Sequence, residues 1–121
     1  MRHLIALAGA LAVAAVATAA TAGRPAATPT LVGTVGPGYT ITLKSSGKAV
    51  KTLKAGTYKL TIHDKANIHS FSVDGPNGYS KTFTAVPFVG TKTFTVKLQA
   101  GGYKYFCPPH ASIMFGHFTV K

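Results

Sequence analysis

Hydrophobic and polar residues alternate along most of the chain after residue 30. The alternating positions lie in six short segments, at residues 41–43, 58–62, 69–73, 94–98, 103–107 and 118–120. Successive side chains of a β-strand point to opposite faces, so this period of two predicts strands with one buried and one exposed face. No segment of residues 23–121 has the length and period of an amphipathic helix.

Residues that favour tight turns separate these segments. Glycine, proline, serine and asparagine gather at residues 36–38, 45–47, 55–56, 74–78 and 100–102. Many short strands with regularly spaced turns predict an all-β fold, in which two sheets form a β-sandwich. The large aromatic side chains are expected in its core: Tyr39, Tyr58, Phe71, Phe94, Tyr103, Tyr105 and Phe118.

The first 22 residues have a different composition from the rest. A short positive start precedes an alanine-rich apolar run over residues 4–20, and small residues follow before Gly23. This pattern is typical of a secretory signal peptide. The alternative is an uncleaved N-terminal anchor, because ~17–25 apolar residues can span a bilayer. We therefore expect a signal peptide at 1–22, a proline-containing linker at 23–29 and one domain at 30–121, secreted or in the periplasm or cell envelope.

The period of two also sorts the residues that can bind a metal. His69 and Cys107 lie in phase with the buried positions of their segments, whereas His63 and His117 lie out of phase and are expected to face outward. Cys107 is the sole cysteine of the chain. A single thiol in a secreted protein indicates an intermolecular bridge, a reactive thiol or a metal ligand.

The segment CPPHASIM, residues 107–114, places Cys107, His110 and Met114 on one short loop after a strand. With His69 from another strand, the donors are one thiolate, two imidazoles and one thioether. Two histidines and a cysteine with a weak axial methionine are the donor set of electron-transfer copper sites. Taken singly, the same residues have other interpretations, namely a buried apolar thiol, a hydrogen-bonded core histidine and a core methionine.

At these residues the chain resembles the small blue copper proteins, or cupredoxins, of the plastocyanin, amicyanin and pseudoazurin type. The segment GGYKYFCPPHASIMFGHFTV (101–120) resembles the family pattern of glycine, alternating aromatics, cysteine, two residues, histidine, a gap, methionine and a final strand. The segment HDKANIHSFSVDGPNG (63–78) is similar to the segment with the family's first histidine ligand. The resemblance implies a Greek-key β-sandwich that binds one copper ion through His69, Cys107, His110 and Met114.

Two positions depart from the family pattern. Ser70 follows the first histidine, where the family often has an asparagine whose side chain helps to tie the ligand loops together. Pro108 follows the cysteine, where a hydroxyl or acidic residue is common. Neither Pro108 nor Pro109 has an N–H to donate. We therefore hypothesise that the thiolate receives a single backbone hydrogen bond, from Ser70, and bonds copper more covalently as a result.

The charge of the chain is strongly positive. Its 13 lysines and arginines oppose two acids, Asp64 and Asp74, which gives a formal net charge of +11. The lysines are dispersed and form no tight basic run, which argues against nucleic acid as a partner. A solvated lysine-rich surface and a surface that attracts an acidic partner both remain open.

We hypothesise a non-enzyme that carries single electrons between protein redox partners outside the cytoplasm, as a monomer without stable membrane insertion once the signal peptide is removed. By the resemblance, His110 is the electron's exit route through an apolar patch, for which Phe88, Ile113 and Phe115 are candidates. The alternatives are a copper-binding or delivery protein and a cupredoxin-fold interaction module. A Cys–His hydrolase also needs an orienting group and oxyanion donors, and structural zinc usually takes four nitrogen or sulfur ligands without methionine.

Overall fold

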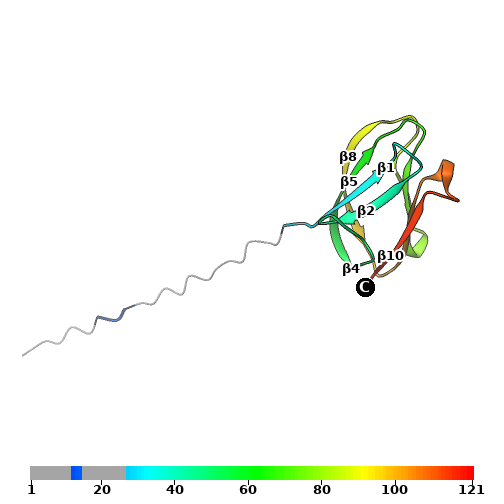
Figure 1. Cartoon of the computed structure of the whole chain (residues 1–121). Helices are drawn as coiled ribbons and strands as arrows, with labels where there is room; N and C mark the ends of the chain where they lie inside the picture. Colours follow the sequence, from blue (N-terminus) through cyan, green and yellow to red (C-terminus); the bar gives the residue numbers. More distant parts are fainter. Residues whose placement is uncertain (1–11, 15–26) are drawn as a thin grey trace, which may run out of the picture.

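The computed structural model describes residues 12–14 and 27–121, and the latter range forms two sheets packed face to face (Figure 1). In chain order the elements are β1 (Thr30–Val35), β2 (Ile41–Ser45), β3 (Lys48–Ala49), β4 (Thr52–Leu53), β5 (Gly56–Asp64), β6 (Phe71–Asp74), η1 (Pro76–Gly78), β7 (Ser80–Thr84), β8 (Gly90–Leu98), β9 (Gly101–Phe106), η2 (Pro108–His110) and β10 (Phe115–Val120). The predicted all-β sandwich is confirmed.

The two sheets have five strands each. The strand orders are β3-β2-β1-β5-β8 and β4-β10-β9-β6-β7. β1 pairs in parallel with β5, and β10 pairs in parallel with β4, whereas the other pairs are antiparallel. The chain passes from β5 to β6 and from β7 back to β8, so its connections cross between the sheets as in a Greek-key sandwich.

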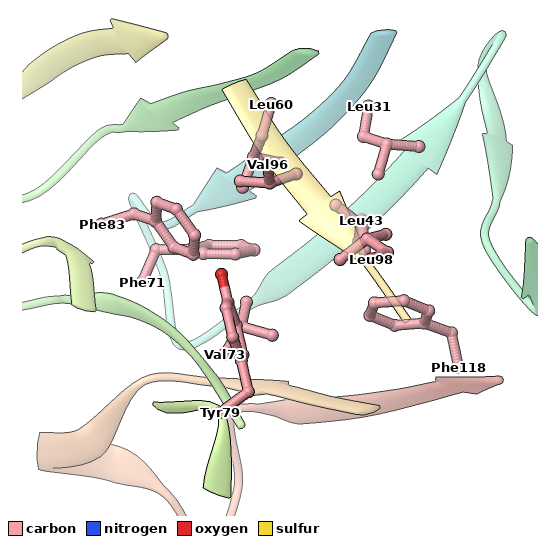
Figure 2. Close-up of a pocket in the computed structure, with 10 residues that line it drawn as sticks. All are labelled: Leu31, Leu43, Leu60, Phe71, Val73, Tyr79, Phe83, Val96, Leu98 and Phe118. Carbon is pink, nitrogen blue, oxygen red and sulfur yellow. The ribbon is translucent and has the colours of Figure 1, made fainter. Parts of the chain in front are cut away.

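The core lies between the two sheets and follows the alternating pattern of the sequence. In β5, Tyr58, Leu60 and Ile62 are buried, whereas Lys59 between them is exposed. A small apolar cavity of about 20 Å³ lies in this core. Figure 2 shows the ten residues that line it: Leu31, Leu43, Leu60, Phe71, Val73, Tyr79, Phe83, Val96, Leu98 and Phe118. None of them is a predicted ligand, so the metal chemistry lies elsewhere.

The strand registers bring four loops to one end of the sandwich. The residues that end the flanking strands are paired with one another: Val35 with Asp64, Asp64 with Gly90, Phe71 with Thr84, and Phe106 with Phe115. We call these loops the loop end; they comprise residues 36–40, 65–70, 85–89 and 107–114. In Figure 1 the last of them, coloured orange, projects from the sandwich. Each predicted ligand belongs to one of these loops.

Most of the N-terminal segment is outside the described part of the chain. Residues 1–11 and 15–26 are not described, so the signal peptide at 1–22 and most of the linker at 23–29 stay predictions. Residues 27–29 are exposed and have no regular secondary structure. Within the described ranges, no helix has the length and hydrophobicity that crossing a membrane requires.

Candidate metal centre

Three of the predicted ligands converge at the loop end. The Nδ1 atoms of His69 and His110 are 3.3 Å apart, and the Sγ atom of Cys107 lies 3.8 Å from the former and 3.6 Å from the latter. The centre of a triangle with these sides is roughly 2 Å from each corner, close to the ~2.0–2.3 Å of metal–nitrogen and metal–sulfur bonds. Two imidazole nitrogens and a thiol sulfur in this arrangement fit one metal ion.

A hydrogen bond fixes which nitrogen of His69 is free. Nε2 lies 2.8 Å from the carbonyl oxygen of Gly38, and a carbonyl can only accept, so Nε2 carries the proton and donates it. The lone pair of the neutral ring is therefore on Nδ1, which faces His110 and Cys107. A second partner of this kind orients metal-binding histidines in proteins. His69 is thus held ready to act as a ligand through Nδ1.

The backbone of the 107–114 loop closes on itself. The N–H of Cys107 donates to the carbonyl of Met114 at 3.0 Å, and the N–H groups of His110 and Met114 donate to Cys107 and His110, both at 2.9 Å. These bonds place Cys107 and Met114 side by side at the base of the loop. Met114 is fully buried. The axial role of Met114 stays a prediction.

The sulfur of Cys107 accepts a hydrogen bond from the backbone N–H of Ser70, at 3.4 Å. Among the described residues, Ser70 is the one whose backbone N–H donates to this sulfur. A single backbone donor is what the two prolines of the loop predict. The Ser70 hydroxyl does not bind the ligand loop, because it donates to the carbonyl of Thr84 in β7 at 2.7 Å. The serine therefore ties the centre to a neighbouring strand.

The centre is enclosed on most sides. Cys107, His69 and Met114 are 0% exposed, whereas His110 is partly exposed. A buried thiolate needs a positive partner, because moving a charge into a medium of low dielectric is costly. A bound cation would meet this need. His110 is thus the one member of the cluster that is not fully buried.

Tyr39 is a neighbour of the centre that the sequence pattern assigned wrongly. It was expected in the core, but it lies in the 36–40 loop and is 58% exposed. Its ring meets the rings of His110 and His69 edge-to-face, with centroids 4.9 and 5.6 Å away. Apolar and polar residues alternate from Tyr39 to Leu43, but β2 begins only at Ile41. Tyr39 therefore has the pattern of a strand residue although it lies in the preceding loop.

The other two histidines of residues 27–121 lie outside the cluster, as predicted. His63 is in β5, and its Nδ1 is 3.0 Å from the hydroxyl of Thr91 on the neighbouring strand. His117 is exposed on β10, and its ring packs against Phe115 with centroids 5.8 Å apart. Neither ring is placed to join His69 and His110.

Sequence and structure comparisons agree on the family. The family described as "Copper binding proteins, plastocyanin/azurin family" matches residues 35–121. The chain belongs to this family. A structure of the copper protein rusticyanin matches this cupredoxin with a TM-score of 0.56 and 26% identity over 76% of each chain. Rusticyanin from Thiobacillus ferrooxidans gives 0.50 and 28%, again over 76% of each chain.

An amicyanin variant in its Cu(I) form matches with a TM-score of 0.51 over 77% of this chain and 83% of its own. At 14% identity this likeness shows the fold alone. A search of curated proteins gives no match. Together, the family and the cluster of His69, Cys107 and His110 identify this cupredoxin as a blue copper protein that binds one copper ion.

The surface around the centre of this cupredoxin is apolar with a positive rim. Within residues 27–121, the exposed large hydrophobic side chains lie in or beside the loop end: Tyr39, Ile68, Val86, Val89, Ile113 and Phe115. Lys92 Nζ lies 4.3 Å from the ring centroid of Phe88, and Lys104 Nζ lies 5.1 Å from that of Phe115. The four loops contain no aspartate or glutamate.

Proposed function

We propose that this cupredoxin carries single electrons between protein redox partners, with His69, Cys107 and His110 as its strong copper ligands and Met114 as a weak axial ligand. The triangle of donor atoms, with sides of 3.3–3.8 Å, carries this proposal. Copper bound by such a set supplies a one-electron couple. The donors already lie together and are held by backbone and ring hydrogen bonds, so they need little rearrangement between the two oxidation states.

His110 has the position required for electron exchange with a partner. The residue is partly exposed, while the other strong donors are buried. Ile113 and Phe115 are 63% and 47% exposed beside it, which makes them suitable members of an apolar docking patch. Phe88 contributes less apolar surface, because it is half-buried and Lys92 lies over its ring. A partner that packs against this patch would bring its own redox centre close to His110.

The charge around the patch indicates the kind of partner. Lys65 lies in the loop end, and Lys92 and Lys104 lie near it. Of the two acids, Asp64 is buried at the end of β5, and Asp74 ends β6 in register with Lys104. Lysines therefore outnumber exposed acids around the patch. Opposite charges raise the rate of encounter between proteins. We propose a protein partner that carries acidic groups around its redox centre.

Burial of the donors favours electron transfer over copper delivery. A delivery protein must release its metal to an acceptor, which requires ligands that the acceptor can reach. Here Cys107 and His69 are fully buried, and Met114 beside them is equally inaccessible. His110 alone offers a path for ligand exchange. Metal release therefore requires the 107–114 loop to open, whereas electron transfer does not.

Copper loading with a redox titration tests the proposed function. The purified protein with one equivalent of Cu(II) is expected to become intensely blue, through charge transfer from thiolate to metal, and to bleach and recover reversibly when reduced and reoxidised. A protein that stays pale with Cu(II), or a colourless complex that passes its copper to a chelating acceptor, contradicts the proposal. The second result favours delivery.

We propose that the protein works outside the cytoplasm, after cleavage of residues 1–22. The alanine-rich run and the small residues before Gly23 support this, as does a single thiol that a metal would protect. N-terminal sequencing of the protein from a cell fraction tests it. A chain that begins at Gly23 outside the cytoplasm is expected, and an intact chain in the cytoplasm contradicts the proposal.

A further inference from the structure

The end of β7 is irregular where it approaches the copper centre. Phe71 pairs with Thr84 and Ser72 with Thr82, so Phe83 is an extra residue in β7 and forms a β-bulge. Regular alternation would bury only one of two successive residues. Here Phe83 and Thr84 are both buried, at 4% and 1% exposed. The bulge thus turns Thr84 inward, toward the start of β6.

Thr84 holds the start of β6 through two hydrogen bonds. Its hydroxyl accepts the backbone N–H of Phe71 at 3.1 Å, and its carbonyl accepts the hydroxyl of Ser70 at 2.7 Å. Both bonds are buried. They fix two neighbouring residues to the same point of β7. The Ser70 N–H then donates to the sulfur of Cys107 at 3.4 Å.

We propose that Thr84 is a positioning residue for the copper-binding thiolate and thereby sets the reduction potential of the centre. This inference rests on the proposed copper ligation by Cys107. Thr84 acts through Ser70, whose N–H it aims at the sulfur. The positive end of an N–H dipole near the metal favours the oxidation state with less positive charge, Cu(I). Loosening this N–H therefore lowers the potential and strengthens electron donation from sulfur to Cu(II).

The substitution Thr84→Val tests the hydroxyl with a side chain of similar shape. It leaves the Phe71 N–H without its acceptor, so a lower reduction potential and a shifted thiolate-to-copper absorption band are expected. Thr84→Ser keeps the hydroxyl and is expected to restore both values toward wild type. The matched control is Thr82→Val on the same strand, which loses the bond of 2.9 Å between the Thr82 and Ser72 hydroxyls but does not involve Ser70.

The controls decide between a specific and a general effect. If Thr84→Val leaves the potential unchanged, or if Thr82→Val shifts it equally, the proposal is wrong. A second pair decides the matter when Thr84→Val does not fold. Ser70→Ala removes the bond to the Thr84 carbonyl and is expected to lower the potential, whereas Ser72→Ala is not. Equal potentials in this pair also contradict the proposal.

A measurement on the copper-free protein separates this inference from the proposed function. Amide hydrogen exchange of Ser70 reports how firmly its N–H is held, whether or not copper binds. Faster exchange at Ser70 in Thr84→Val than in Thr82→Val is expected. Unchanged exchange at Ser70 rejects the positioning role of Thr84, even if the wild-type protein is blue. A colourless wild-type protein with Cu(II) rejects the copper function instead, and the exchange result still stands.

Discussion

The Nε2 atom of His69 donates a hydrogen bond to the carbonyl oxygen of Gly38, across 31 residues of chain and a distance of 2.8 Å. The loop between β1 and β2 therefore belongs to the copper centre, although it supplies no ligand. The same loop places Tyr39 against the rings of both histidines. A change in this loop is expected to act on the metal site without touching a donor atom.

Replacing the thiol removes the origin of the colour. We expect Cys107→Ser to fold and to show no intense blue absorption with Cu(II), because a hydroxyl cannot replace a thiolate in charge transfer to copper. Visible absorption and electron paramagnetic resonance of the copper-loaded variant provide the measurement. His117→Ala is the control, since His117 lies outside the cluster and its loss should leave the colour intact. A blue Cys107→Ser protein would show that the colour does not come from a Cys107 thiolate.

Replacing the methionine separates its axial role from a packing role. Met114→Leu is expected to keep the blue colour and to raise the reduction potential, because Cu(II) loses a donor more than Cu(I) does. Redox titration measures the shift. Ile113→Leu, on the same loop but 63% exposed, is the control and should leave the potential as it is. An unchanged potential in Met114→Leu would show that Met114 is core rather than ligand.

Gly36 and Gly47 form a matched pair for testing the first loop. Both have a left-handed backbone, with φ of 75° and 76°. A Cβ at Gly36 would lie 2.9 Å from Cδ2 of His69, whereas a Cβ at Gly47 would meet nothing within 4 Å.

We expect Gly47→Ala to cost about 1–2 kcal/mol of unfolding free energy through backbone strain alone. Gly36→Ala should cost a further ~1–3 kcal/mol from crowding and should alter the copper spectrum. Chemical denaturation and visible absorption of the two variants provide the comparison. Equal losses of unfolding free energy and equal spectra would show that the His69 ring moves aside at little energetic cost.

The lysines beside the loop end should control the rate of electron transfer with charged reagents. For the anionic oxidant ferricyanide, the rate is expected to fall a few-fold in a Lys92→Gln, Lys104→Gln variant and to fall with added salt. Lys97→Gln is the control, because Lys97 pairs with Thr57 at the opposite end of β5 and β8. Stopped-flow appearance of the blue band, starting from the reduced protein, measures the rates. A cationic oxidant should show the reverse salt dependence, and equal effects of all three lysines would argue against local steering.

Two tyrosines should make stability decrease at alkaline pH. Burial raises the pKa of Tyr79 above its ordinary value of 10.0, and the nearby Tyr103 adds to the effect. Burial also raises the pKa of Tyr105, although a hydrogen bond with the Leu43 backbone opposes the shift. Because the folded state holds these protons more tightly than the unfolded state, their stabilising effect is complete below pH 10 and is lost as the pH rises through the raised values.

Denaturation in urea between neutral and strongly alkaline pH measures this loss, with Tyr79→Phe and Tyr105→Phe as comparisons. Each phenylalanine variant should lose less stability above pH 10 than the wild type does. If the variants follow the wild-type curve, other groups account for the alkaline loss.

The sequence predicted the fold well where side chains alternate strictly. In β5 and β8, each half-buried strand shows apolar residues at every second position, and the all-β sandwich follows from them. The segment SKTFT of β7 contains one large apolar residue, Phe83, so its pattern gave no strand signal. The bulge in β7 also breaks the period of two and hides the burial of Thr84.

The candidate site was predicted mainly from residue chemistry, and the period of two selected His69 over His63 and His117. Cys107, His110 and Met114 share one loop, and their donor types indicated copper before any geometry was known. The supporting contacts were not predictable in the same way. Gly38 and Thr84 act on the centre mainly through backbone carbonyls and a single hydroxyl, and carbonyls are present at every position of a chain. Only the folded structure shows which of these carbonyls contact residues of the copper centre.

The positive rim around the apolar patch also affects encounters between two copies of this protein. Self-exchange of an electron requires two copies to meet loop end to loop end, so that Lys92 and Lys104 of each would approach their counterparts. At low ionic strength this repulsion slows the reaction. Under the proposed electron-transfer function, this repulsion would favour transfer to a partner of opposite charge over exchange between identical carriers.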